Sequence, residues 1–178
     1  MSVIKHTDQR VGAFIDVENF YHSAKNLFGA RVNFKKILQE AVGKRKLIRA
    51  IAYVIRTETR EEKPFFEALT RLGIETKVKD LQIYKESKKA DWDVGIAVDA
   101  IKISSSLDVI LLFSGDGDFI PLVEYLKNNG KQVEVIAFSK STSSKLKGVA
   151  DDFFDIGDSK KYLLSYKSPR EDNKKNRK

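Results

Sequence analysis

The sequence predicts an α/β fold, a three-layer α/β/α sandwich with a mainly parallel central sheet. Three observations favour this class. Apolar, β-branched runs alternate with segments of helical periodicity along the chain. The most apolar run, LDVILLF at 107–113, indicates a buried strand. The 178 residues, 42% of them apolar, are ample for the core of one domain of ordinary size.

The predicted elements follow one another regularly. Strands are expected at 11–16, 46–56, 74–79, 107–115 and 131–138, and helices at 17–29, 34–42, 59–73, 91–104 and 118–130. The segment 81–86 extends the third strand or pairs beside it, and 141–158 holds a short helix and an edge strand.

Start and stop signals support these helices. Asn33 is a typical N-cap for the helix 34–42, and Pro64 fits the first turn of the helix 59–73. Glycines stand where four helices are expected to end: Gly29, Gly43, Gly73 and Gly130.

The positive charge is concentrated near the C-terminus. The chain has a net charge of +8, and from Ser159 onward eight Lys or Arg face only Glu171 and Asp172. Six of the eight net charges therefore belong to 159–178, which we expect to be a disordered basic tail. Residues 1–158 form the predicted globular domain.

Composition excludes several kinds of protein. No stretch approaches the ~18 to 20 apolar residues of a membrane helix, and the N-terminus lacks the apolar core of a signal peptide. We therefore expect a cytoplasmic protein with no membrane partner. The absence of cysteine excludes disulfides and thiolate metal sites, and two histidines are too few for a His-rich zinc site.

Acidic residues follow two of the predicted strands directly. Asp16 ends the first strand, and Asp116 and Asp118 follow the strand 107–113 in the stretch SGDGDF. Ligand sites in open α/β sheets lie outside the carboxyl ends of strands, so these acids are expected to converge if the two strands are neighbours. The glycines at 115 and 117 are expected to let the backbone turn tightly there.

Each acid also has a structural explanation. Asp118 is a candidate cap for the helix that follows, and Asp91 a candidate cap for the helix 91–104. Asp93, just inside that helix, has a weaker structural explanation, and Asp99 falls on another side of it. Asp16 is the hardest to explain structurally, because a partly buried carboxylate is costly unless it is paired or bound to a metal.

A hard divalent cation resolves the mutual repulsion of these carboxylates. Mg²⁺ or Mn²⁺ takes oxygen ligands from a few carboxylates, waters and phosphates, and needs neither His nor Cys. Such ions activate water and stabilise the charge that develops on a phosphodiester.

Three stretches in this order resemble the NYN domain family of the PIN-like nuclease superfamily: FIDVENF, ADWDVGIAVDA and SGDGDFIPLVEYLKNNGKQVEVIAF. The resemblance spans about residues 10–158 and implies a PIN-like fold with an acidic, Mg²⁺- or Mn²⁺-dependent ribonuclease site. It implies the catalytic and metal-binding acids Asp16, Asp93, Asp116 and Asp118. A further acid is often added in this superfamily, and Glu58, Glu61 and Glu62 are the positional candidates.

The resemblance also implies contacts with the substrate. Asn19 is the polar partner of Asp16 in the D-x-x-N motif, and Thr142 and Ser143 either touch phosphate or cap a helix. From the residues themselves, Lys89 leads into the acidic helix, and Trp92 either stacks on an unpaired base or packs in the core.

The expected function is therefore a metal-dependent ribonuclease that hydrolyses RNA, with single-stranded RNA the favoured partner. The alternative is a non-catalytic RNA-binding or regulatory module that retains the fold. An aspartyl phosphatase is disfavoured because no second acid stands two residues after Asp16, and dinucleotide binding because no G-x-G-x-x-G follows the first strand. The oligomeric state is open, a homodimer included.

Overall fold

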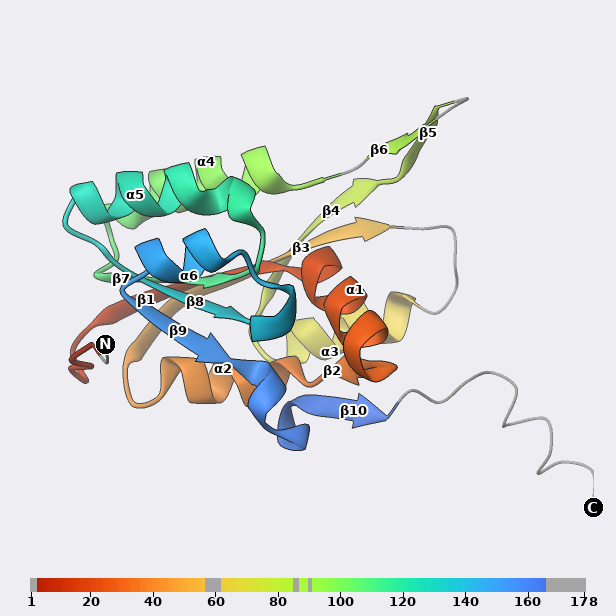
Figure 1. Cartoon of the computed structure of the whole chain (residues 1–178), viewed down its shortest axis with the longest axis horizontal. Helices are drawn as coiled ribbons and strands as arrows, with labels where there is room; N and C mark the ends of the chain where they lie inside the picture. The colour runs from red at the N-terminus through yellow and green to blue at the C-terminus, as the bar shows by residue number, and fades with distance from the viewer. Residues whose placement is uncertain (1–2, 57–61, 85–86, 90, 166–178) are drawn as a thin grey trace, which may run out of the picture.

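The computed structural model describes residues 3–56, 62–84, 87–89 and 91–165, and shows a parallel sheet between two layers of helices (Figure 1). The six sheet strands are β1 (Arg10–Asp16), β3 (Lys46–Arg56), β4 (Glu75–Asp80), β7 (Val109–Phe113), β8 (Gln132–Ala137) and β9 (Asp152–Asp155). The helices are α1 (Val17–Phe28), α2 (Phe34–Val42), α3 (Glu62–Arg71), α4 (Asp93–Ser104), α5 (Ile120–Asn128) and α6 (Ser144–Val149). This is the predicted α/β/α class.

The sheet order is β4-β3-β1-β7-β8-β9, and every neighbouring pair is parallel. β1 and β7 therefore lie side by side at the centre, as the acidic motifs require. β9 is the edge strand expected from 141–158.

Smaller elements complete the chain. The strands β2 (Ala30–Val32) and β10 (Leu163–Ser165) pair, as do β5 (Gln82–Tyr84) and β6 (Ser87–Lys89). Four 3₁₀ turns are η1 (Gly117–Phe119), η2 (Ser139–Ser141), η3 (Ile156–Asp158) and η4 (Lys160–Tyr162).

The central strands supply both hydrophobic cores because successive side chains point to opposite faces. On β7, Val109, Leu111 and Phe113 pack with α1, α2 and α3, whereas Ile110 and Leu112 pack with α4, α5 and α6. All five side chains are fully buried. Figure 1 shows α4 and α5 above the sheet and α2 and α3 below it. The continuous apolar run in the sequence thus reflects burial on both faces.

The folded body extends beyond the expected boundary at residue 158. Tyr162 is 4% exposed, its ring lies edge-on to Phe154, and its hydroxyl hydrogen-bonds to Glu40. Asn33 donates its backbone N–H to the Tyr162 carbonyl at 2.8 Å. The charge of 159–178 obscured the short apolar stretch that docks here, so only 166–178 remain as the basic tail, and these lie outside the described residues.

Within the described residues, no helix combines the length and the apolar character needed to cross a bilayer.

Candidate active site

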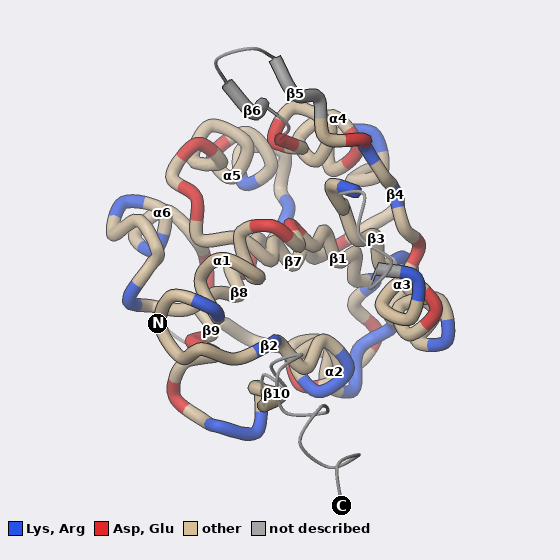
Figure 2. Tube along the Cα trace, turned by 90° about the vertical axis from the view of Figure 1, so that its right-hand side faces the viewer, with Lys and Arg blue, Asp and Glu red and all other residues tan. Residues whose placement is uncertain are grey.

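The carboxyl ends of β1 and β7 lie side by side, which brings Asp16 next to the loop that carries Asp116. The two strands are in register to Ile15 and Phe113, so Asp16 ends β1 beside the loop that begins at Ser114. Figure 2 looks onto this edge, with α1 in front of β1 and β7 and with α4 above them. The predicted adjacency of the two motifs is confirmed.

Asp16 lies at the base of the site and is 9% exposed. Its Oδ1 accepts a hydrogen bond from the Asn19 backbone N–H at 3.2 Å, which caps α1, and its Oδ2 accepts one from the Ser114 hydroxyl at 3.1 Å. Burial raises the pKa of Asp16, while the hydrogen bonds from Asn19 and Ser114 oppose that rise. Both oxygens are thus satisfied by the protein, which explains how this acid tolerates burial.

Asn19 connects helix α1 to the loop after β7. Its Oδ1 accepts a hydrogen bond from the Gly115 backbone N–H at 3.0 Å. Together with the bond between Ser114 and Asp16, this contact fixes the loop that carries Asp116 against the start of α1. The structure therefore gives Asn19 a positioning contact, and its contact with substrate stays a prediction.

Three carboxylates converge above Asp16. One oxygen each from Asp93, Asp116 and Asp118 lies within 4.8 Å of the other two. Asp93 belongs to the first turn of α4, and Asp116 and Asp118 to the loop and turn after β7. Oxygen donors at this spacing suit a hard divalent cation. Asp16 lines the same cavity but is outside this triplet.

The site is a small, strongly acidic hollow of about 170 Å³. It is lined by Asp16, Glu18, Asn19, His22, Ile55, Asp91, Trp92, Asp93 and Asp116. No Lys or Arg belongs to this described lining. Among the described lining residues, negative charge therefore accumulates without a fixed Lys or Arg beside it.

The accumulated charge is evident at Asp93. Burial is the largest cause and the negative charges of Asp16, Asp116, Asp91 and Asp118 add to it, so that together they raise the pKa of Asp93 to about 6. In the folded chain without metal, Asp93 thus holds its proton more tightly than an ordinary aspartate. A bound cation would reverse that effect.

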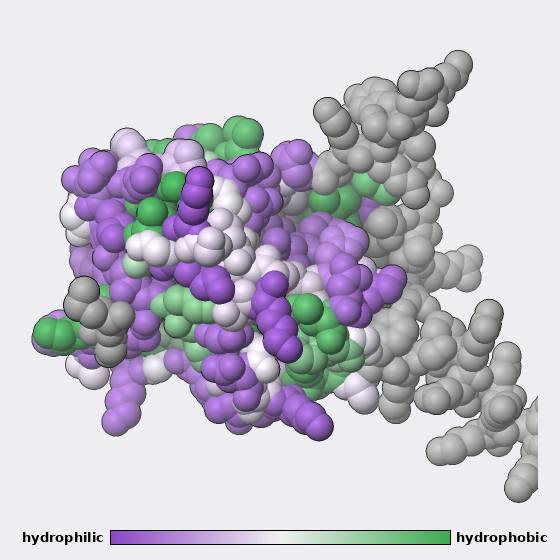
Figure 3. Space-filling model, viewed as in Figure 1, coloured by the Kyte–Doolittle hydropathy of each residue, from purple (hydrophilic) through white to green (hydrophobic). Residues whose placement is uncertain are grey.

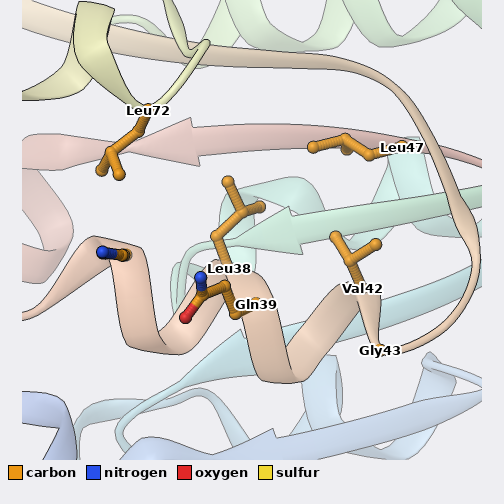
Figure 4. A pocket seen from close by; sticks show the side chains of 7 residues that line it. Leu38, Gln39, Val42, Gly43, Leu47 and Leu72 are labelled. Carbon is orange, nitrogen blue, oxygen red and sulfur yellow. The ribbon is translucent and has the colours of Figure 1, made fainter.

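A larger hollow of about 310 Å³ lies elsewhere, beside α2 and the start of β3 (Figure 4). Its seven lining residues are Lys35, Leu38, Gln39, Val42, Gly43, Leu47 and Leu72. None of them is acidic, and none is a Ser, Thr, Cys or His. The smaller hollow is therefore the candidate functional site because of its chemistry rather than its size.

Thr142 and Ser143 approach the loop after β7 from the other side. The hydroxyl of Thr142 donates to the Phe138 carbonyl at 2.7 Å, and Ser143 caps α6 by accepting from the Leu146 N–H at 3.4 Å. A Cβ on Gly115 would lie 2.7 Å from the Thr142 hydroxyl. These contacts place both residues beside Asp116, and phosphate contact by either stays a prediction.

The glycines of SGDGDF have a different role from the one expected. Among the described residues, positive φ occurs at Gly29, Gly43, Gly73 and Gly130, and neither Gly115 nor Gly117 shares it. Their contribution is space, because a side chain at either position would meet Thr142 or Ser143. The expectation of a glycine-specific turn was wrong.

Two expected helix caps were also wrong. Asp116, rather than Asp118, caps the turn after β7, and its Oδ1 accepts from the Asp118 N–H at 2.9 Å. At α4 the cap position is Trp92, not Asp91, and no side chain caps that end. Asp99 faces away from the site, as expected, and accepts hydrogen bonds from Tyr53 and Lys77.

Trp92 is fixed by packing at the rim of the hollow. Its indole N–H donates to the Val54 carbonyl at 3.0 Å, and its ring lies edge-on to Tyr53 with centroids 5.3 Å apart. The ammonium of Lys79 lies 4.3 Å from the ring centroid. The structure thus gives Trp92 a packing role beside Asp93, and its stacking on a base stays a prediction.

The comparisons with known proteins agree with this geometry. Residues 10–157 match the NYN domain family. The chain belongs to the NYN domain family.

Three relatives show how far this NYN domain resembles known proteins. It is 25% identical over 170 residues to the Low amplitude and bright protein LabA of Synechococcus elongatus, across 90% of each chain. The Uncharacterized protein MJ0482 of Methanocaldococcus jannaschii is 32% identical over 94 residues, which are 52% of this chain and 35% of that protein. A crystal structure of VPA0982 from Vibrio parahaemolyticus, a protein of unknown function, matches with a TM-score of 0.82 and 30% identity over 91% of this chain and 100% of that one.

Some site residues of this NYN domain were not anticipated. Glu18 and His22 line the hollow from α1, and their side chains lie 3.4 Å apart. Glu18 and His22 are four residues apart and follow Asp16 closely, so they share one side of the predicted helix, which was the available signal. The Lys89 side chain, Glu58, Glu61 and the Glu62 side chain lie outside the described part of the chain.

We expect Asp93→Asn to stabilise the NYN domain at neutral pH in EDTA. Because folding raises the pKa of Asp93, the group stabilises the fold below pH ~4, and this contribution is lost as the pH rises through about 6. The substitution removes that loss, so the free energy of unfolding should rise by about 1 kcal/mol at pH 7.5 after allowance for solvent screening. Thermal melts from pH 4 to 8 should show a gain that vanishes at the acidic end.

Asp99→Asn on the same helix is the matched control. Burial acts to raise the pKa of Asp99, but hydrogen bonds from Lys77 and Tyr53 outweigh burial and lower it. Its stabilisation is therefore present at neutral pH and is lost as the pH falls, so Asp99→Asn should lower the melting temperature at pH 7.5. Equal effects of the two variants would contradict the charge account of the site.

Gly95→Ala should displace Trp92 and destabilise the protein. A Cβ on Gly95 would lie 2.5 Å from Cε3 of the Trp92 ring, which Val54 and Tyr53 hold in place. Alanine normally stabilises a helix by about 0.5–1 kcal/mol relative to glycine, so the contact should reverse the usual sign.

Trp92 is the only tryptophan, so its fluorescence spectrum should shift in Gly95→Ala. The control is Gly148→Ala in α6, where nothing lies within 4 Å of the added Cβ and the ordinary stabilisation is expected. An unchanged spectrum and a raised melting temperature in Gly95→Ala would contradict the packing assigned to Trp92.

Proposed function

We propose that this NYN domain is a ribonuclease that hydrolyses RNA phosphodiester bonds with Mg²⁺ or Mn²⁺. The observation that supports this most directly is the convergence of three carboxylate oxygens, from Asp93, Asp116 and Asp118, within 4.8 Å of one another. Asp93 and Asp116 also line the hollow whose described lining has no Lys or Arg. An uncompensated acidic cluster of this kind is the usual protein half of a site that binds a divalent cation with a phosphate.

In this proposal Asp93, Asp116 and Asp118 hold the cation, each through a carboxylate oxygen. The cation would activate a water molecule and neutralise the charge that develops on the phosphodiester. Asp16 lies behind the triplet, keeps the loop in place through Ser114, and adds negative charge that favours a cation. Its direct ligation of metal remains part of the proposal.

The substrate is expected to cross the loop that follows β8. Exposed Lys140 and Lys145 flank Thr142 and Ser143, which contact the glycines beside Asp116. Lysines on this loop would neutralise RNA phosphates, and the acidic hollow would accept the cation. The small volume of the hollow, about 170 Å³, favours a single exposed phosphate of unpaired RNA over a duplex.

A second candidate function is a non-catalytic RNA-binding module. It is favoured by one observation, that both oxygens of Asp16 are engaged by Asn19 and Ser114. If Asp16 cannot join the triplet, a cation would bind without the full set of acids that hydrolysis needs. Metal binding without cleavage would identify this case.

The test uses the single tryptophan as a reporter of the site. Mn²⁺ bound beside Trp92 should quench its fluorescence, whereas diamagnetic Mg²⁺ should compete without quenching. Asp116→Asn keeps the cap to Asp118 but removes a ligand charge. It should raise the Mn²⁺ concentration for half-quenching by about tenfold or more and lower RNA cleavage by about 10²-fold or more.

The control is Asp8→Asn, an exposed acid that pairs with Lys46 at the opposite end of the sheet. It should change neither quenching nor cleavage. Cleavage that persists in EDTA, or that Asp116→Asn leaves intact, would contradict the proposed ribonuclease.

A further inference from the structure

One side of helix α1 continues from the acidic hollow onto the outer surface. Four residues share this side, because positions three or four apart are neighbours on a helix. They are Glu18, Tyr21, His22 and Lys25. Another side of α1 is buried in the core. Glu18 and His22 line the hollow, and the next turn of the same side carries an aromatic ring and a positive charge.

Tyr21 presents that aromatic ring beside the hollow. It is 41% exposed, whereas the ring of Phe20, the residue before it, is 1% exposed in the core. The ring of His22 lies edge-on to Tyr21 with centroids 5.4 Å apart, and Glu18 lies 3.4 Å from His22. An exposed ring next to a residue that lines the hollow offers a face on which a flat group can stack.

Lys25 places a cation on the far side of this ring. Its ammonium lies 5.7 Å from the centroid of Tyr21, and the side chain is exposed. Within the part of the chain that the structure describes, no Asp or Glu forms a salt bridge with Lys25. Its charge is therefore available to an anionic ligand that also covers the ring.

We propose that Tyr21 and Lys25 form a stacking subsite for the unpaired nucleotide beside the cleaved bond. The base stacks on Tyr21, and the phosphate beyond it contacts Lys25. This inference rests on the proposed ribonuclease, in which the cation of the hollow holds the phosphate that is cleaved. Cation, ring and ammonium then follow one another in the order phosphate, base, phosphate of a nucleotide strand.

The surface chemistry fits a single strand better than a protein or a duplex. Figure 3 shows hydrophilic and hydrophobic surface side by side over α1, which Figure 1 locates. The core of a protein interface is depleted of charged residues, whereas Glu18 and Lys25 lie on either side of Tyr21 along the helix. A paired base is stacked within its duplex and cannot reach the ring unless it is flipped out.

Stacking also sets what the subsite can distinguish. Every base has a π-face, so stacking on an aromatic ring tolerates any base sequence. The subsite is therefore expected to select unpaired over paired strands and to ignore the identity of the base.

The first experiment measures the binding of a labelled, unstructured RNA by fluorescence anisotropy in EDTA, where metal-dependent cleavage is absent. Tyr21→Ala should weaken binding by about five- to 150-fold, the range expected for one stacked base. Tyr21→Phe keeps the ring and should bind within about twofold of the wild type. Tyr21→Leu keeps apolar bulk without a π-face and should behave as Tyr21→Ala.

The matched control is Tyr125→Ala in α5, on the other side of the sheet, where the ring is 47% exposed. It should leave RNA binding unchanged. Because Tyr21 is 41% exposed, its variants should melt close to the wild type, which thermal melts check.

The second experiment tests the phosphate contact through its salt dependence. Lys25→Gln should reduce the slope of log affinity against log salt by about 0.7, the share of one phosphate of a single strand. Lys102→Gln, an exposed lysine in the last turn of α4, is the control and should leave the slope unchanged.

The outcomes separate this subsite from the ribonuclease itself. Weaker binding by Tyr21→Ala and Tyr21→Leu alone, with no cleavage by the wild type in Mg²⁺ or Mn²⁺, would support the subsite and contradict the ribonuclease. Cleavage by the wild type with unchanged binding by Tyr21→Ala would overturn the subsite alone. A wild type that binds no RNA, with or without Mg²⁺, would overturn both.

Two further results would also overturn the subsite. One is equal affinity of Tyr21→Phe and Tyr21→Leu, which would show that bulk rather than a π-face acts at this position. The other is an equal loss of affinity for duplex RNA in Tyr21→Ala, which would show that no unpaired base is bound there.

Discussion

The parallel pairing of β1 with β7 is the constraint on which the site depends. It sets Asp16 beside Ser114, and hydrogen bonds from Ser114 to Asp16 and from Gly115 to Asn19 then fix the loop that carries Asp116 and Asp118. Because the strands are buried on both faces, the loop has little freedom to relax away from the acids around it. The rigid sheet therefore holds carboxylates together that would otherwise separate.

Burial and that enforced proximity together have an energetic cost, and they raise the pKa of Asp93. The protein reduces the cost at Asp16 with two hydrogen bonds, whereas the described lining of the hollow offers Asp93 and Asp116 no Lys or Arg. Strain stored in this way is released when a cation binds, so metal affinity and metal-free stability oppose each other. Trp92 contributes by fixing the start of α4, and hence Asp93, against β3.

Much of the fold and of the site's location was predictable from the sequence because continuous apolar runs indicate the buried strands. The run 107–113 and the exit at Asp16 indicated two neighbouring strands, and the sheet edge followed from general rules. Details set by contacts between distant segments were not predictable. The role of Gly115 depends on its contact with Thr142. The packing of Trp92 depends on Val54 and Gly95, and the docking of Tyr162 depends on Glu40 and Asn33. No local pattern encodes such pairs.

The central claim is that Asp93, Asp116 and Asp118 share one divalent cation. Anomalous diffraction from a crystal of the wild-type chain soaked in Mn²⁺ tests it most directly. The account predicts a strong peak within about 2.0–2.3 Å of carboxylate oxygens from all three residues, and no peak there in an Asp116→Asn crystal treated alike. A wild-type map without a peak at the triplet at saturating Mn²⁺, or with Mn²⁺ bound only elsewhere, would contradict it.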